Sequence, residues 1–316
     1  MAAVTRGQAC TCYSSFMHRK LTPAAALLLT IPPLMWAGNA VVGRLISDLI
    51  SPMTLNFLRW VLAFALLMPL ASHVLRPSSQ LWPNWRRFSL LGLLSVGAYN
   101  ALLYMALNTS EPVNVTLVGS STPVWMLLIG RVFYGVSISG RQFLGAVLSI
   151  SGVMLVLSRG QLDLLLQLHL VPGDLFVLTA SACWAYYSWM LSRPTTEPPD
   201  IRANWSAFLL GQMAFGLVWS GLFAGGEWAL DKAHITWGWP LAVALVFIAV
   251  GPALIAYRAW GAGVSRAGPA AAGFFANLTP LFAAVFSTAF LGETPQLYHL
   301  LAFALIVGGI LVSSRR

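Results

Sequence analysis

Ten apolar runs, separated by short polar stretches, follow one another along the chain and limit its possible folds more than any other feature. A helix that spans a bilayer needs about 20 mostly apolar residues, so ten such helices would use about two thirds of a chain of this length. Only 9% of the residues are charged, against roughly 25% in an ordinary soluble domain. The sequence therefore predicts an all-α integral membrane protein. Its transmembrane helices are expected at residues 22–43, 52–73, 88–108, 113–133, 141–158, 173–192, 204–224, 238–257, 268–290 and 296–313.

The distribution of Lys and Arg predicts which side of the membrane each end of the chain faces. If both termini lie in the cytoplasm, fourteen of the 18 Lys and Arg residues fall on the cytoplasmic side. Arg44, Arg159 and Lys232 then fall outside, and Arg59 lies within the second helix. Short cytoplasmic loops collect Lys and Arg, so this bias predicts cytoplasmic termini. Because these charges are scattered singly and form no basic stripe, the net charge of +9 does not indicate a nucleic-acid partner.

The first 21 residues precede the first apolar run and are expected to form a cytoplasmic extension. Since His18, Arg19 and Lys20 stand directly before that run, a cleaved signal peptide is a competing interpretation. Two adjacent prolines, Pro32 and Pro33, are unusual in the apolar region of a signal peptide. Removing this helix would also break the internal repeat, so we favour a retained transmembrane helix.

An internal repeat determines the predicted architecture. Residues 112–159 align without a gap on residues 269–316 when the chain is shifted by 157 positions. Matches at that offset are Pro112 with Pro269, Thr122 with Thr279, Pro123 with Pro280, Phe133 with Phe290, Gly135 with Gly292, Leu144 with Leu301 and Gly152 with Gly309, and a weaker echo at another offset pairs Trp36-Ala37 with Trp184-Ala185. Helices four and five therefore correspond to nine and ten. We expect two five-helix repeats, at residues 22–159 and 160–316, and an odd number of helices inverts the second repeat.

The charges beside the repeated segments agree with this inversion. Arg131 and Arg141 flank a loop that is predicted to be cytoplasmic. Their counterparts in the second repeat, Thr288 and Tyr298, flank a loop that is predicted to be external and that carries Glu293. Each copy therefore carries the charges that suit its own orientation.

Several short motifs, in this order within a duplicated ten-helix chain, resemble the EamA family of the drug/metabolite transporter superfamily. The motifs are Trp36-Ala37-Gly38-Asn39, Ser51-Pro52-Met53-Thr54 leading to Leu58-Arg59 and Ala63, Gly173-Asp174-Leu175, and Leu291-Gly292-Glu293-Thr294. The chain departs from the family pattern at Val136, where Gly-Glu is usual, and in reading WAGN where W-G-x-N is commoner. The resemblance covers roughly residues 24–315. It implies export of amino acids or related metabolites across the bacterial inner membrane, and the high aromatic content is most similar to that of the aromatic amino-acid exporters.

Aromatic and polar residues near the middle of several helices predict a substrate cavity. Transporters with inverted repeats place the substrate near the bilayer midplane, where the repeats meet. The candidate cavity residues are Trp36, Asn39, Tyr99, Asn100, Tyr104, Ser121, Trp125, Trp184, Tyr187 and Asn277. Their rings could pack against an aromatic or large apolar group, and their amides and hydroxyls could bind amino and carboxyl groups. Asn and Ser also join neighbouring helices, which is the alternative role.

The other tryptophans are expected at the membrane surfaces, because Trp and Tyr concentrate in interfacial belts. These residues are Trp60, Trp82, Trp85, Trp205, Trp228, Trp237 and Trp239. Arg44 and Arg258 lie near predicted helix ends, so we expect them to anchor those ends.

Prolines inside predicted helices are candidate hinges for alternating access. Pro33, Pro123 and Pro280 each lie within or near the interior of a helix, where a proline frees a backbone carbonyl and permits a kink. Membrane helices also tolerate proline without any such role, and this alternative stays open.

Arg59 is predicted to lie about seven residues into the second helix, on the order of 10 Å below the outer surface. A charge inside the membrane is a functional hypothesis by default. Arg59 could bind a substrate carboxylate. Alternatively, its side chain could extend outward to the surface and brace helix carbonyls, which is the interpretation that we favour from the sequence.

The acidic residues and histidines all fall in loops or at helix ends, so the sequence predicts no proton relay through the membrane core. An enzyme that acts on lipid would need clustered catalytic side chains, so we expect a transporter and not an enzyme. A carrier of phosphorylated sugars or nucleotide sugars would need several cationic cavity residues, and only Arg59 qualifies. Cys10 and Cys12 form a lone C-x-C pair, so neither a metal nor a cofactor is expected. The expected partners are a small-molecule substrate and the bilayer, and a monomer is one possible oligomeric state.

Overall fold

The computed structural model describes residues 21–106, 109–110, 112–161, 163, 171–192, 198–291 and 296–314. The predicted N-terminal extension and the Gly292-Glu293-Thr294 motif therefore lie outside the described residues. Tyr104 belongs to a described helix, but its side chain lies outside the described part of the structure.

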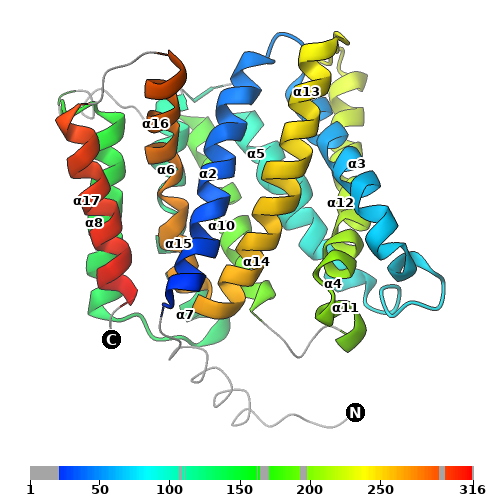
Figure 1. The fold of residues 1–316 in the computed structure, drawn as a ribbon, viewed down its shortest axis with the longest axis horizontal. Coiled ribbons are helices and arrows are strands. Elements are labelled where there is room, and N and C mark those ends of the chain that lie inside the picture. The colour runs from blue at the N-terminus through cyan, green and yellow to red at the C-terminus, as the bar shows by residue number, and fades with distance from the viewer. Residues whose placement is uncertain are drawn as a thin grey trace.

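The described residues form ten helical rods that stand side by side (Figure 1), which confirms the all-α fold. The rods are α2 (Pro23–Leu45), α3 (Pro52–Ala71) continued by η1 (Ser72–Leu75), α4 (Trp85–Gly92) with η2 (Leu93–Ala98) and α5 (Tyr99–Ala106), α6 (Pro112–Gly119) with α7 (Thr122–Tyr134), α8 (Gly140–Leu157), α10 (Pro172–Leu191), α12 (Trp205–Ala229), α13 (Trp239–Ile248) with η3 (Ala249–Ile255) and α14 (Ala256–Ala267), α15 (Pro269–Ala276) with α16 (Thr279–Leu291), and α17 (Leu297–Ser314). The sequence did not predict the short helix α11 (Pro199–Ala203), which precedes α12.

Eight helices of the described chain are long and apolar enough to cross a membrane. The remaining two rods are α4–η2–α5 and α10. Helix α10 contains Asp174 and several Ser, Tyr and Trp residues, and it packs in the centre against α5, α7 and α14. Its polar and aromatic side chains therefore lie among other helices and not at the periphery.

The packing of the rods is consistent with two related five-helix halves. Helix α2 packs on α14 and α16, and the corresponding helix of the second half, α10, packs on α5 and α7. The rods at corresponding places, α8 with α17 and α3 with α12, pair with each other. Helix α2 begins and α17 ends at the lower end of the bundle in Figure 1, whereas α3 begins at the upper end.

Two pairs of rods are interrupted at places that the 157-residue offset relates. The π-helical turns η2 and η3 interrupt the third and eighth rods, and the offset carries residues 93–98 onto 250–255. The fourth and ninth rods break at Ser120 and at Asn277, which are also 157 residues apart. The helices predicted at 88–108, 113–133, 238–257 and 268–290 are therefore present, but each is interrupted.

The helix breaks change the place of two candidate hinges. Pro123 and Pro280 each occupy the second position of a new helix, α7 or α16, and not a helix interior. A proline is tolerated there because the first N–H groups of a helix have no intrahelical partner. Pro33, in contrast, lies inside α2, as expected.

The end of the eighth rod was also predicted wrongly. It runs ten residues past the predicted end at 257, and Gly268 ends it with a φ of +84°. Pro269 then begins α15. The apolar run in the sequence stops at Arg258, but a charged side chain does not end a helix whose backbone bonds can continue.

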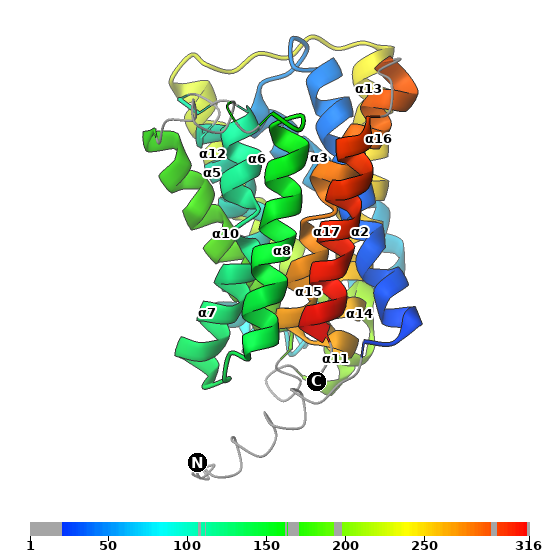
Figure 2. The same cartoon turned by 90° about the vertical axis from the view of Figure 1, so that its left-hand side faces the viewer.

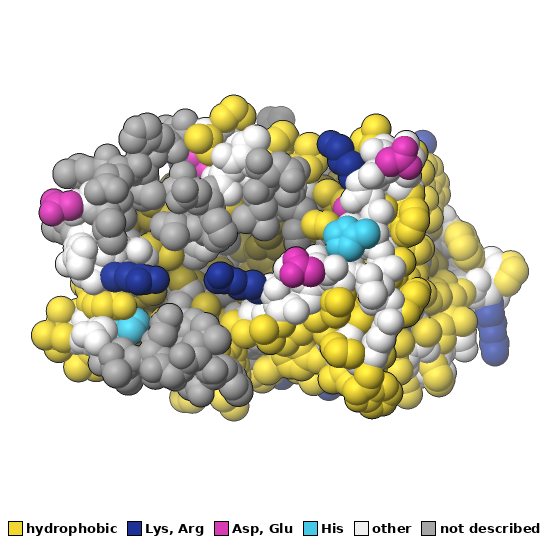
Figure 3. All heavy atoms as spheres, turned by 90° about the horizontal axis from the view of Figure 1, so that it is seen from above, with side chains coloured by type: hydrophobic (Ala, Val, Ile, Leu, Met, Phe, Trp, Pro, Cys, Tyr) yellow, Lys and Arg dark blue, Asp and Glu magenta, His cyan; other side chains and the backbone are white. Residues whose placement is uncertain are grey.

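The described part of the upper end of the bundle is mostly apolar (Figure 3). Basic, acidic and histidine side chains are scattered over it. Five of the seven tryptophans expected at the membrane surfaces are at least 40% exposed, and Trp239 reaches 80%. Trp60 is completely buried, so its expected surface position was wrong.

Helices α8 and α17 lie side by side (Figure 2) and approach each other closely through glycine. A Cβ atom at Gly145 would lie 2.7 Å from the Gly309 carbonyl oxygen, and one at Gly309 would lie 2.6 Å from the Gly145 oxygen. Small residues allow such close backbone contact between membrane helices. The last helices of the two halves, α8 and α17, therefore contact each other directly through their backbones.

We expect Gly309→Ala to lower the free energy of unfolding by about 1 to 3 kcal/mol, because its methyl group overpacks the α8 backbone. Gly308→Ala is the matched control, since no atom lies within 4 Å of a Cβ at that position. Denaturant unfolding of both variants in detergent, followed by circular dichroism, compares them. Equal destabilisation by the two substitutions would contradict the close contact.

The carboxylate of Glu227, at the end of α12, caps the start of α3. Its oxygens accept hydrogen bonds from the Ser51 hydroxyl at 2.7 Å, the Thr54 hydroxyl at 2.8 Å, and the backbone N–H groups of Met53 and Thr54 at 3.1 and 2.9 Å. An anion is favourable at a helix N-terminus, where the first N–H groups lack partners. The Ser51-Pro52-Met53-Thr54 motif is thus explained by a contact between the two halves.

Glu227→Gln should lower the free energy of unfolding by about 2 kcal/mol, because hydrogen bonds to a charged acceptor become weaker neutral ones and one amide N–H faces other donors. Asp231→Asn removes the same charge from an exposed residue four positions later and should have little effect. The midpoints of thermal unfolding in detergent test the pair. A loss of stability in Asp231→Asn as large as in Glu227→Gln would show that net charge, and not the cap, is responsible.

Candidate substrate cavity

A cavity of about 290 Å³ lies in the upper half of the bundle, where the two halves meet. Arg59 on its wall is the eighth residue of α3, roughly 10 Å along the axis from the upper end at 1.5 Å per residue. Of the sequence-predicted site residues, the wall contains Trp36, Asn39, Arg59, Tyr99, Asn100, Trp184, Asn277 and Pro280. The side chains come from α2, α3, α5, α10 and the breaks in the interrupted rods. We refer to this space as the central cavity.

The remaining predicted residues lie elsewhere. Tyr187 lines a second cavity below the first. Ser121, Trp125, Pro33 and Pro123 do not line the central cavity, although Ser121 and Pro123 directly neighbour wall residues Ser120 and Thr122 in the chain. The Ser121 hydroxyl is buried and has no hydrogen-bond partner among the described residues.

Trp184 is the centre of an aromatic cluster beside the central cavity. Its ring centroid lies 5.1 to 5.6 Å from those of five other aromatic side chains, and it is 3% exposed. The five neighbours are Trp36, Tyr99, Tyr187, Tyr257 and Trp260. Trp36 meets Trp184 edge to face at 86°. Trp36 and Trp184, which correspond to each other in the weaker internal repeat of the sequence, are therefore in contact.

Asn277 joins the breaks of the fourth and ninth rods. Its amide nitrogen donates to the Ser120 carbonyl oxygen at 3.2 Å and to the Ser149 hydroxyl oxygen at 2.9 Å. Residues 120 and 277 are themselves a pair related by the offset. Asn277 therefore satisfies a carbonyl at a helix break, where a missing partner would be costly inside a membrane.

Arg59 is the one charged side chain on the described wall of the central cavity. It is 5% exposed, and its guanidinium carbon lies 5.4 Å from the ring centroid of Trp60. Its Nε atom is buried without a hydrogen-bond partner among the described residues. The expectation that Arg59 extends outward to the surface was therefore wrong. Its side chain is enclosed beside the cavity.

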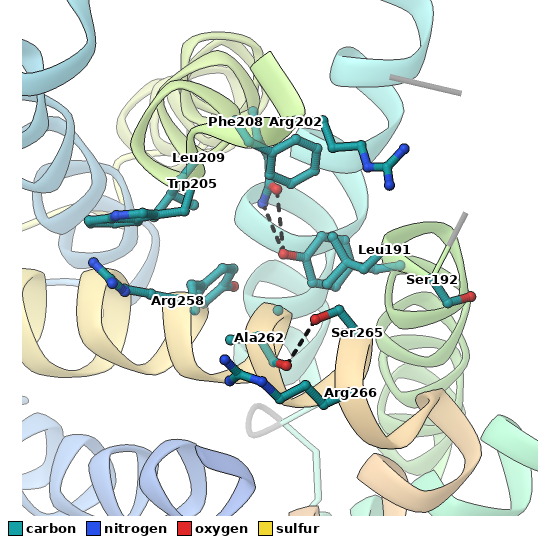
Figure 4. A pocket seen from close by; sticks show the side chains of 14 residues that line it. Leu191, Ser192, Arg202, Trp205, Phe208, Leu209, Arg258, Ala262, Ser265 and Arg266 are labelled. Atoms are coloured by element: carbon teal, nitrogen blue, oxygen red, sulfur yellow. Dashed lines mark hydrogen bonds between the residues drawn. The ribbon is translucent and has the colours of Figure 1, made fainter. Parts of the chain in front are cut away.

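A second cavity of about 640 Å³ lies below the first, among α10, α11, α12 and α14. Arg202, Arg258 and Arg266 line it, together with Ser265, whose hydroxyl donates to the Ala262 carbonyl oxygen at 2.9 Å (Figure 4). We refer to it as the lower cavity. Its described wall contains three arginines and no acidic residue.

The sequence predicts that Arg258 anchors a helix end, but it does not. Its guanidinium carbon lies 4.2 Å from the ring centroid of Trp205, so the cation rests against an aromatic face (Figure 4). Trp205, expected in a membrane-surface belt, lines the lower cavity. Arg258 was misplaced because the eighth rod is longer than its apolar run, whereas Trp205 is the first residue of α12 and so does lie at a helix end.

Three aromatic residues separate the central cavity from the lower cavity. Trp184 lines the first, Tyr187 lines the second, and Tyr257 lines both. We refer to these three residues as the aromatic partition. At Tyr257 a single side chain borders both spaces, so the partition is thin.

Hydrogen bonds to Ser95, within the π-helical turn η2, hold the partition in place. The Tyr257 hydroxyl donates to the Ser95 carbonyl oxygen at 2.8 Å. The Gln212 amide donates to the Ser95 hydroxyl at 2.7 Å and lies 3.4 Å from the Tyr187 hydroxyl. Because a π turn shifts the backbone hydrogen-bond pattern, a carbonyl inside a membrane helix becomes accessible to a side chain.

The sequence interpretation did not identify Ser95, Gln212, Tyr257 or Trp260. One signal was present, since extending the offset of 157 toward the N-terminus places Tyr257 opposite Asn100, another wall residue. The two rods have little identity at that register, which hides this correspondence in the sequence.

Comparisons with known proteins agree with this fold. The sequence model of the EamA-like transporter family matches residues 23–158 and 171–315. A solved crystal structure superposes with a TM-score of 0.71 over 91% of this chain and 95% of the other, at 21% identity, which shows the shared fold.

Three relatives illustrate the range of similar proteins. The uncharacterized transporter YyaM of Bacillus subtilis is 26% identical over 237 residues, 75% of each chain. An uncharacterized transporter of Archaeoglobus fulgidus is 24% identical over 92% of this chain and 97% of its own. The aromatic amino acid exporter YddG of Ancylobacter novellus is 24% identical over 74% of this chain and 77% of its own. With both halves matched by the family model, this chain belongs to the EamA-like transporter family and is a multi-pass membrane transporter, not an enzyme.

Proposed function

We propose that this transporter exports amino acids, above all aromatic and other neutral ones, and related small metabolites across the bacterial inner membrane. The observation that carries the proposal is the aromatic wall of the central cavity around Trp184. Rings in this arrangement pack well against an aromatic or large apolar group. One relative, at 24% identity, is named an aromatic amino acid exporter.

The size of the central cavity supports a small substrate. Its volume of about 290 Å³ is just below the usual range of ligand pockets, roughly 300 to 1,000 Å³. A molecule of amino-acid size suits this space better than a nucleotide sugar.

We propose that transport proceeds by alternating access across the aromatic partition. The central and lower cavities approach each other from opposite ends of the bundle, and Tyr257 borders both. Opening the partition while closing the upper end would pass the substrate from one cavity to the other. Pro33 and the helix breaks beside Pro123 and Pro280 are the proposed hinges, because helix interruptions beside the substrate recur in transporters with inverted repeats.

The proposed orientation places both termini in the cytoplasm and the lower cavity in the cytoplasmic half of the bundle, with inverted halves at residues 22–159 and 160–316. The excess of Lys and Arg at predicted cytoplasmic positions supports it. In this orientation the central cavity belongs to the outer half of the membrane.

A carrier of phosphorylated sugars is the second candidate, and the three arginines of the lower cavity favour it. Phosphate binding usually involves several charge-assisted hydrogen bonds, whereas the described wall of the central cavity offers only Arg59. Competition for flux between L-tryptophan and glucose 6-phosphate distinguishes the two candidates.

Cysteine labelling tests the proposed orientation in a variant without the native cysteines. Ser78, between η1 and α4, and Thr236, between α12 and α13, are exposed at opposite ends of the bundle. A maleimide that does not cross membranes should label Thr236→Cys in intact cells and Ser78→Cys only after permeabilisation. The reverse pattern would overturn the orientation.

Substitution of the aromatic centre tests the substrate proposal. Trp184→Ala should reduce counterflow of labelled L-tryptophan in proteoliposomes at least about tenfold, since it removes the ring that contacts five others. Trp239→Ala, at an 80% exposed tryptophan, should retain the wild-type rate. Gel filtration checks that both variants are folded. Absence of counterflow in the wild-type protein with Trp, Phe, Thr and Met would refute amino-acid transport.

A further inference from the structure

Arg59 places on the wall of the central cavity a positive charge that no described residue compensates. It is 95% enclosed, since only 5% of its surface is exposed. The described residues provide it with no ion pair and no hydrogen bond to its buried Nε atom. A buried charge is costly unless an opposite charge or strong hydrogen bonds compensate it. Evolution usually retains such a charge inside a membrane for function.

No acidic side chain lies on the described wall of the central cavity. Asp174 and Glu227, the acids that the structure describes with hydrogen-bond partners, cap α10 and α3 instead. The contact between Arg59 and the Trp60 ring, at 5.4 Å to the centroid, stabilises a cation but does not cancel its charge. The compensating negative charge is therefore absent from the described protein around Arg59.

We propose that the compensating charge comes from the substrate, and that the central cavity binds apolar or aromatic monocarboxylates, which carry one net negative charge, more tightly than the zwitterionic amino acids of the proposed function. This inference rests on the proposed role of the central cavity as the substrate site. Arginine is suited to the task, because its planar guanidinium group binds a carboxylate through two parallel hydrogen bonds. The rings of Trp36 and Trp184 then pack on the apolar body of the ligand.

The same wall discriminates against an additional positive charge. The carboxylate of a zwitterionic amino acid would neutralise Arg59, but its ammonium group would remain. The amide groups of Asn39, Asn100 and Asn277 can accept hydrogen bonds from an ammonium group, but they carry no charge to balance it. Two cations in one enclosed space repel each other strongly because screening there is weak. The cavity therefore binds a carboxylate better when no ammonium group accompanies it.

Three probes with the same phenyl ring and two-carbon chain test this selection. They are 3-phenylpropanoate, with a net charge of −1, L-phenylalanine, a zwitterion, and 2-phenylethylamine, with a net charge of +1. Isothermal titration calorimetry on the full chain in detergent should give the tightest binding for 3-phenylpropanoate, at least about tenfold tighter than for L-phenylalanine. 2-Phenylethylamine should bind most weakly. This comparison uses the wild-type protein and does not depend on any variant folding.

Three variants identify Arg59 as the source of the selection. Arg59→Gln should weaken binding of 3-phenylpropanoate at least about tenfold and bring its affinity close to that of L-phenylalanine. Arg59→Lys retains the charge and should preserve the order of the three probes. Arg44→Gln, which removes an exposed arginine near the end of α2, should leave all three affinities unchanged.

The outcomes separate this inference from the proposed function. If L-phenylalanine binds as tightly as 3-phenylpropanoate, or if Arg59→Gln leaves their ratio unchanged, the selection is refuted and amino-acid transport stands. If no phenyl compound binds, the pair 4-methylpentanoate and L-leucine repeats the comparison without a ring. A preference for 4-methylpentanoate would then retain the selection for anions and refute the aromatic substrate. If neither the phenyl compounds nor 4-methylpentanoate and L-leucine bind, both proposals are refuted.

Discussion

The contacts of Trp184 with five other rings hold the centre of this transporter together. Lipid chains are as apolar as leucine, so helices in a membrane associate through close packing and polar contacts, with little help from the hydrophobic effect. Aromatic pairs contribute about 0.5 to 1.5 kcal/mol each beyond the area that they bury. The rings around Trp184 come from α2, α5, α10 and α14, which are the rods at the junction of the two halves. The same residue thus stabilises the fold, forms the cavity wall and belongs to the aromatic partition.

Interruptions in the helices determine which polar residues are free to meet a ligand. The π-helical turn at Ser95 and the break at Ser120 present carbonyl groups that membrane lipid cannot satisfy. Tyr257 and Asn277 supply those hydrogen bonds, so their polar atoms already have structural roles. Arg59 has no comparable role among the described residues. Location on a cavity wall therefore does not by itself distinguish a residue that binds substrate from one that repairs the backbone.

The sequence predicted the number and type of helices well, because apolar runs and the 157-residue repeat are strong signals. It also placed Trp36, Asn39, Tyr99 and Trp184 near a common cavity, since aromatic residues at mid-depth are unusual there. The sequence-based prediction failed where a contact between two helices allows one of them to extend beyond its apolar run. Arg258 marks the end of an apolar run, but stacking on Trp205 beside a cavity allows the helix to continue. Sequence patterns cannot show such a pairing between rods seven and eight.

Arg59 and Gln212 occupy the same place along the corresponding helices α3 and α12. Arg59 is the eighth residue of α3, and Gln212 is the eighth residue of α12. Arg59 lines the central cavity, whereas Gln212 lines the lower cavity and bonds to Ser95. In the proposed inverted arrangement, the two halves would otherwise form two similar surfaces facing opposite sides of the membrane. The guanidinium group of Arg59 and the neutral amide of Gln212 therefore make the central and lower cavities chemically different at corresponding places. The charge beside the central cavity comes from α3, whereas the three arginines of the lower cavity come from α11 and α14, so the two cavities do not take their positive charge from corresponding helices.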